Sequence, residues 1–141
     1  MKLIKGEFEK ELRLNFAQAL KAGFPSPSED YMHESLDFNR DMIKHPEATF
    51  YGKVEGDSMM GAGICNGDIA VIDRALIPEH GDVVVASVDG EFTVKFLDMT
   101  HVKEGYIELK PANDDFKPIR IKEEMYFRVW GVVVYTIKSW K

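Results

Sequence analysis

The sequence has 141 residues, a length typical of one compact domain with a short extension. Its 45% hydrophobic and 30% charged residues are those of a globular chain, and its net charge of −6 argues against a protein that wraps DNA through a basic surface. The single cysteine excludes an internal disulfide. No apolar run approaches the ~20 residues that span a bilayer, and the charged amino-terminal sequence is unlike a secretion signal. We therefore expect a cytoplasmic protein without a membrane segment.

Residues 1–22 carry a net charge of +2, whereas residues 23–141 carry −8. A basic arm of this kind is able to lie on the acidic body or on a second copy, although charge fluctuation in a short segment explains the difference equally well. Apolar side chains recur every four residues at Phe8, Leu12, Phe16 and Leu20. This spacing predicts a helical arm that needs a packing partner, because an isolated helix of this length is marginal in water.

The segment from Ala22 to Ser28 has the composition of a linker, since Pro25 and Pro27 bar a regular helix. Residues 29–44 show a mixed helical pattern that Pro46 ends. We therefore predict a linker and one short helix before the next part of the chain.

From Thr49 onward the sequence is typical of β structure. The predicted strands cover residues 50–54, 68–73, 82–88, 91–97, 106–109 and 126–137. Asp89-Gly90 is a pair suited to a tight hairpin, and Gly131 inside the last strand predicts a bend or bulge. Strands without alternating helices indicate a mainly antiparallel β body.

Metal and phosphate sites find no support in the sequence. The histidines, at positions 33, 45, 80 and 101, stand apart from one another, and Cys65 has no neighbouring cysteine to complete a zinc site. The segment Gly61–Gly67 lacks the lysine of a phosphate-binding loop and is interpreted as a surface loop. We expect no metal and no cofactor.

Two residues have patterns that fit nucleophilic catalysis. Ser58 follows a predicted strand within Gly56-Asp57-Ser58-Met59, a turn that can expose a hydroxyl and direct backbone N–H groups to one point, although such a serine is more often only a turn residue. Lys95 lies in an alternating strand, where it points either to solvent or into a partly buried site beside Ser58. Burial would lower the pKa of Lys95 and allow its neutral amine to take the serine proton.

Several short segments occur in a characteristic order. They are Ala22–Pro27, His45-Pro46, Gly56–Met59, Asn66–Asp68, His80–Val84, Asp89–Lys95 and Trp130–Val133. This ordered set resembles the LexA/UmuD family of self-cleaving proteins, in particular its UmuD branch, and the resemblance covers residues 20–138.

The resemblance implies a mainly β, LexA/signal-peptidase-like domain of several short, coiled antiparallel sheets with a short helical N-terminal arm. It implies that Ser58 is the nucleophile, that Lys95 is the general base, and that the backbone N–H groups of Ser58 and Asp57 hold the oxyanion. The implied cut lies between Ala22 and Gly23. The UmuD branch usually has Cys-Gly at this bond, whereas Ala-Gly matches LexA-type repressors, and small residues on both sides suit close approach to the serine.

The implied domains are a removable arm (1–22), a linker with a short helix (23–47) and a Ser-Lys peptidase-like β domain (48–141). The 22 residues before the cut are too few for the helix-turn-helix domain of LexA, which favours an accessory protein over a repressor. The resemblance implies that a RecA filament on single-stranded DNA stimulates the cut. The trimmed homodimer would then join an error-prone Y-family DNA polymerase of the UmuC type, without sequence-specific DNA binding of its own.

Two other functions remain open at this stage. A module of the same fold could serve dimerisation or polymerase binding without cleaving. A signal-peptidase-like enzyme would share the Ser-Lys chemistry, but the missing membrane anchor argues against it.

Overall fold

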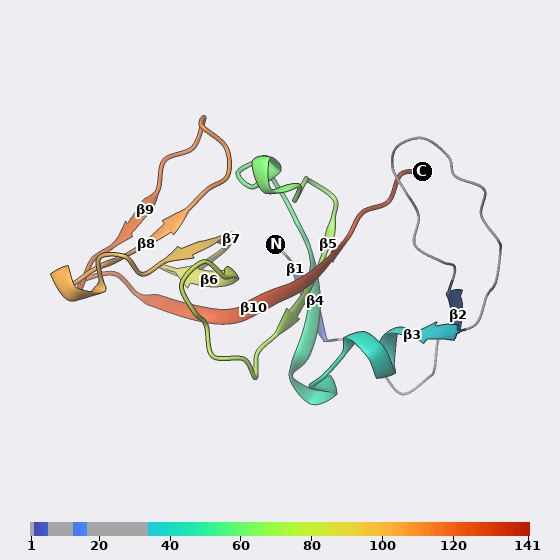
Figure 1. Cartoon of the computed structure of the whole chain (residues 1–141). Coiled ribbons are helices and arrows are strands. Elements are labelled where there is room, and N and C mark those ends of the chain that lie inside the picture. Colours follow the sequence, from blue (N-terminus) through green and yellow to red (C-terminus); the bar gives the residue numbers. More distant parts are fainter. Residues whose placement is uncertain (1, 6–12, 17–33) are drawn as a thin grey trace. The chain divides into compact units, whose positions relative to one another are not determined.

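The computed structural model describes residues 2–5, 13–16 and 34–141. One antiparallel sheet in this part of the chain has the order β1-β4-β5-β10-β6-β7-β8-β9 (Figure 1). Its strands are β1 (Lys2–Lys5), β4 (Thr49–Lys53), β5 (Ile69–Asp73), β6 (Val83–Val88), β7 (Glu91–Asp98), β8 (Ile107–Lys110), β9 (Ile119–Ile121) and β10 (Phe127–Ile137). The predicted mainly β fold class is confirmed, and every predicted strand from Thr49 onward has a counterpart.

The chain divides into two compact units, residues 1–6 with 47–141 and residues 7–46. The first unit contains the eight-stranded sheet and the short helical turns η2 (Pro46–Ala48), η3 (Met60–Ala62) and η4 (Val102–Glu104), of which η2 begins at its boundary. The second contains a two-stranded sheet of β2 (Arg13–Phe16) and β3 (Glu34–Asp37), followed by one π-helical turn, η1 (Phe38–Met42).

The long strand β10 joins the two halves of the large sheet. Its residues 132–137 pair with β5 and its residues 127–132 pair with β6, and the register shifts between Val129 and Gly131. The bulge predicted at Gly131 is therefore confirmed. A Cβ at this position would lie 2.6 Å from Cγ2 of Ile72, so close packing of β10 on β5 also requires glycine.

The β6–β7 hairpin forms as the sequence predicts. Asp89 and Gly90 have positive φ angles of 49° and 86°, the conformation that a tight two-residue hairpin turn needs. The strands pair from Val88 opposite Glu91 to Val83 opposite Phe96, and this register fixes which residues of β7 face the core.

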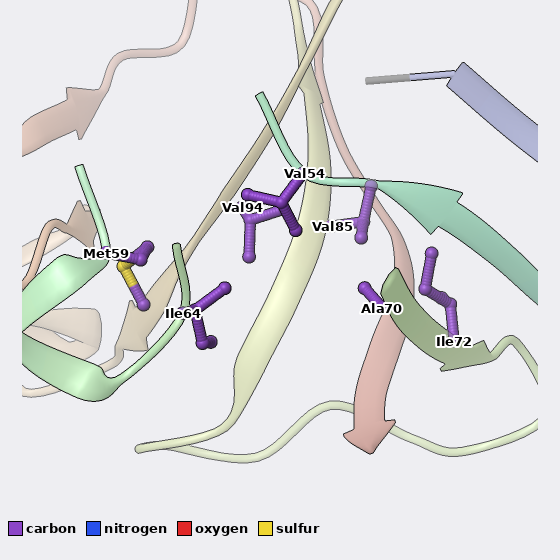
Figure 2. Close-up of a cluster of buried hydrophobic side chains, with 7 residues drawn as sticks. All are labelled: Val54, Met59, Ile64, Ala70, Ile72, Val85 and Val94. Atoms are coloured by element: carbon purple, nitrogen blue, oxygen red, sulfur yellow. The ribbon is translucent and has the colours of Figure 1, made fainter. Parts of the chain in front are cut away.

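Alternation along β6 divides the core into two clusters. Val85 belongs to the first cluster, whereas Val84 and Ala86 belong to the second. The first cluster, shown in Figure 2, consists of Val54, Met59, Ile64, Ala70, Ile72, Val85 and Val94. It contains the residue after Ser58 and the residue before Lys95, so burial of this cluster anchors both predicted site segments.

The predicted helices before Thr49 are wrong where the strands β2 and β3 form. Within the predicted arm helix, residues 13–16 form strand β2, and within the predicted helix over residues 29–44, residues 34–37 form strand β3. The two strands pair antiparallel, from Arg13 opposite Asp37 to Phe16 opposite Glu34. Pairing supplies backbone hydrogen bonds that an isolated short helix cannot maintain in water, so it overrides the helical spacing. The other residues of the predicted arm helix lie outside the described part of the chain.

The helical turn that does form after β3 is held by a side-chain cap. Asp37 is buried, and its carboxylate accepts hydrogen bonds from the backbone N–H groups of Asn39 at 2.9 Å and Arg40 at 3.4 Å. A carboxylate at this position satisfies amides that the first turn leaves free.

Among the described residues, no helix has the length and apolarity needed to cross a membrane.

Candidate active site

Ser58 lies in the turn that follows β4. Gly56 has a φ of 93°, which a residue with a side chain rarely adopts, and its N–H donates to Oδ1 of Asn66 at 2.9 Å. Met59 directly after the serine is only 2% exposed, whereas Ser58 itself is half-buried. The turn is thus anchored in the core on one side and presents the serine hydroxyl on the other.

Lys95 comes from the middle of β7 and is buried, with a relative exposure of 7%. Its Nζ donates to Oγ of Ser58 at 2.9 Å, to Oγ1 of Thr93 at 2.6 Å and to the carbonyl oxygen of Val94 at 3.2 Å. Of the two orientations that strand alternation allowed, the structure therefore has the inward one. It brings together two residues that are 37 positions apart in the sequence.

Burial lowers the pKa of Lys95 because the ammonium form loses its hydration. The three contacts of Nζ suit both protonation states. An ammonium has three N–H donors for them, whereas a neutral amine has two donors, for Thr93 and Val94, and a lone pair that can accept the Ser58 hydroxyl proton. The arrangement can therefore move a proton from the serine oxygen to the lysine nitrogen without rearranging the site.

A loop between β8 and β9 holds the serine turn from a second side. The N–H of Ala112 donates to the carbonyl oxygen of Ser58 at 2.8 Å, and the N–H of Gly61 donates to the carbonyl oxygen of Ala112 at 2.6 Å. Nδ2 of Asn113 donates to the carbonyl oxygen of Asp57 at 2.9 Å. Backbone and side-chain hydrogen bonds thus join the serine turn, residues 57 to 61, to the loop at residues 112 to 113.

The contact with Asn113 fixes the peptide bond between Asp57 and Ser58. In a trans peptide the C=O and N–H groups point in opposite directions, so holding the Asp57 carbonyl directs the Ser58 N–H to the other side. The amide of Asn113 is itself oriented, because its Oδ1 accepts the N–H of Asp115 at 3.0 Å. A fixed backbone N–H beside a hydroxyl has the character of an oxyanion donor.

A cleft of about 160 Å³ opens beside Ser58 and Lys95. Its apolar walls are formed by Val54, Met59, Phe92, Val94 and Phe116. Ala22 and Gly23, the predicted cleavage site, lie outside the described residues.

The sequence patterns missed two residues of this site. The alternation of β7 places Thr93 on the same side as Lys95, so its contact with the amine could have been found by counting two residues back. Asn113 carries no such signal, because only folding brings its loop to the serine turn. In the described part of the chain, no group of three or more His, Cys, Asp or Glu residues could hold a metal ion.

The sequence profile of the Peptidase S24-like family matches residues 15–134. The chain belongs to this family. The predicted membership of the LexA/UmuD group is confirmed by relatives as well as by the profile. Family membership places the chain in a class of serine peptidases, and both residues of the described Ser58–Lys95 pair lie within the matched range.

Three relatives cover different shares of the chain. Protein SamA of Salmonella typhimurium is 43% identical over 124 residues, which are 88% of this chain and 86% of SamA. Protein MucA of Escherichia coli is 37% identical over 86% of this chain and 82% of MucA. Protein ImpA of Salmonella typhimurium is 54% identical over 82 residues, so that match spans 58% of this chain and little more than half of ImpA, 57%.

Proposed function

We propose that this protein is a Ser-Lys peptidase that cuts its own chain between Ala22 and Gly23. The observation that supports the proposal most directly is the 2.9 Å contact between Nζ of the buried Lys95 and Oγ of Ser58. The division into a removable arm (1–22), a linker segment (23–47) and a peptidase domain (48–141) belongs to the same proposal.

The first half of the reaction transfers the arm to the serine. Neutral Lys95 takes the Ser58 hydroxyl proton while Oγ attacks the carbonyl carbon of Ala22. The resulting oxyanion is held by the N–H groups of Ser58 and Asp57. Collapse of this intermediate breaks the bond to the Gly23 nitrogen, which leaves as an amine with the proton from Lys95.

The second half releases the arm. Neutral Lys95 now takes a proton from a water molecule, whose oxygen attacks the ester carbonyl carbon on Ser58. The ester bond breaks, Lys95 returns its proton to Oγ, and the arm leaves with a carboxylic acid on Ala22, which loses its proton to water. Each chain performs this reaction once, since the arm is part of the enzyme.

The cellular role that we propose is that of a UmuD-like SOS mutagenesis protein, supported by the family and by similarity to SamA, MucA and ImpA. A RecA filament on single-stranded DNA stimulates the cut, and the trimmed homodimer acts as an accessory subunit of an error-prone Y-family DNA polymerase in the cytoplasm. DNA contact is indirect, consistent with the charge of −8 on residues 23–141.

Intact mass against time at mildly alkaline pH tests the cut, because alkali increases the neutral fraction of Lys95. We expect loss of residues 1–22 from the wild type and no loss from Ser58→Ala. Gly23→Glu should remain uncut because it enlarges one side of the bond. A wild type that stays intact even with a RecA filament would contradict the proposal and favour the non-cleaving module of the same fold.

A further inference from the structure

The amino-terminal strand β1 covers one edge of the large sheet. It lies next to β4 at the end of the strand order, as Figure 1 shows, and pairs antiparallel with it from Lys2 opposite Lys53 to Lys5 opposite Phe50. Residues 1–6 belong to the same compact unit as the peptidase sheet. The predicted arm therefore contributes a strand to the domain from which the proposed cut would separate it.

The backbone groups of β4 that face β1 can be identified from the other side of the strand. The N–H of Val54 donates to Asp68 and its C=O accepts from Gly67, both at 2.8 Å, while the C=O of Ala48 accepts from Arg74 at 2.9 Å. At both ends of β4, the backbone groups of even-numbered residues therefore form hydrogen bonds on the side of β5. Because backbone direction alternates along an antiparallel strand, Tyr51 and Lys53 direct their N–H and C=O groups to β1.

Cleavage between residues 22 and 23 would leave the arm held only by two strand pairings of four residues each, β1 with β4 and β2 with β3. A tethered strand has a high local concentration at the edge, and a cut strand loses it on dilution. The register of the pairing between β1 and β4 places Lys2 opposite Lys53. The cut would thus open the outer edge of β4.

We propose that this opened edge is a docking site for an extended segment of another protein, which adds a strand antiparallel to β4. The proposal rests on the proposed cut. Open edges bind added strands through backbone hydrogen bonds, here with Tyr51 and Lys53. The exposed Lys53 favours a partner with a carboxylate at the position that Lys2 occupies. A second copy that paired through its own β4 would offer no carboxylate within that strand, Thr49–Lys53.

Hydrogen exchange of individual amides tests whether the edge opens. The full chain carries Ser58→Ala and, over residues 20–25, the recognition sequence of an added protease, so that cutting does not depend on the chain's own activity. After cutting and dilution, we expect the amides of Tyr51 and Lys53 to exchange about tenfold faster or more, since they lose their acceptors. Phe50 and Gly52 are controls in the same strand and should stay protected by β5. Unchanged exchange at Tyr51 and Lys53, or equal loss at all four residues, would overturn the proposal.

Peptides then test docking on the cut protein. One probe has the sequence of residues 1–6, and the second is the same peptide with Lys2→Glu. We expect the Lys2→Glu peptide to restore the protection of the Tyr51 and Lys53 amides at a lower concentration than the unchanged peptide. In a Lys53→Glu chain, the unchanged peptide should be the one that acts at the lower concentration. Failure of both peptides, or a preference that does not reverse, would contradict the docking site. Protection that returns with protein concentration alone would assign the edge to a second copy. Failure of wild-type self-cleavage would refute the proposed function while leaving these readouts intact.

Discussion

The chemistry of the site depends on the environment of one lysine. The pKa of Lys95 is lowered by burial, whereas the pKa values of Lys110 and Lys138 are raised by hydrogen bonds with Asp98 and Asp68. Both of those lysines lie 2.6 Å from a carboxylate oxygen, while Lys95 contacts a serine hydroxyl at 2.9 Å. A lysine held by a carboxylate stays charged, so of these three Lys95 is the one suited to act as a base.

The lowered pKa makes the stability of the protein depend on pH. Between the native pKa of Lys95 and its ordinary value of 10.5, the unfolded chain binds more protons, so the free energy of unfolding should rise with pH in this window. Lys95→Met, compared with its parent in an uncut Ser58→Ala background, should lack this rise. Urea unfolding at a series of pH values measures the difference. Parallel pH dependence of the two proteins would mean that Lys95 titrates normally in the fold.

Asn113 is expected to act on the reaction through the peptide that it holds. Asn113→Asp keeps an oxygen for the Asp115 N–H but replaces the donor to the Asp57 carbonyl with a second oxygen. Loss of one oxyanion donor costs about a hundredfold in rate, so disturbing its orientation should slow self-cleavage at high pH by about tenfold or more.

The variant Asn113→Ala separates positioning from loop stability. It loses both side-chain bonds, whereas Asn113→Asp loses only the bond to Asp57. If both variants cut slowly and retain their midpoint of urea unfolding, Asn113 positions the serine turn. Slow cutting by Asn113→Ala together with normal cutting by Asn113→Asp would assign Asn113 to loop stability alone.

At the scale of elements, the sequence predicts those strands, turns and bulges whose geometry is determined by neighbouring residues. Alternating β-branched residues, the Asp89-Gly90 turn and Gly131 all specify local geometry, and their predictions are confirmed. Residues 13–16 and 34–37 form the paired strands β2 and β3 in place of helix. The four-residue apolar spacing around β2 is compatible with a strand as well as a helix, and pairing between distant segments decides between the two structures. The contact of Asn113 with Asp57 joins residues 56 positions apart and likewise has no local signature.

Two glycines allow the function of an element to be separated from its stability. A Cβ at Gly61 would overlap the carbonyl oxygen of Ala112 beside the serine turn, whereas a Cβ at Gly131 would crowd Ile72 in the core. Gly131→Ala should lower the free energy of unfolding by about 1–3 kcal/mol, the usual cost of overpacking, while cleavage of the folded chain continues. Gly61→Ala should mainly slow cleavage, because it separates the loop at residue 112 from the turn. Chemical denaturation and cleavage rates should be measured on both variants. If the two variants lose the same stability and the same cleavage rate, the assignment of Gly131 to the core and of Gly61 to the site is contradicted.

At the scale of the whole molecule, the nucleophile and the proposed scissile bond belong to the same chain. A tethered substrate has an effective concentration that dilution of the protein does not change. We therefore expect the first-order rate constant of self-cleavage to stay constant over a hundredfold range of protein concentration, and excess Ser58→Ala chain to remain uncut beside the wild type. Intact mass distinguishes the two chains in one mixture. A rate constant that falls in proportion to dilution, with cutting of the Ser58→Ala chain, would show that separate molecules cut one another and that the arm reaches Ser58 only after association.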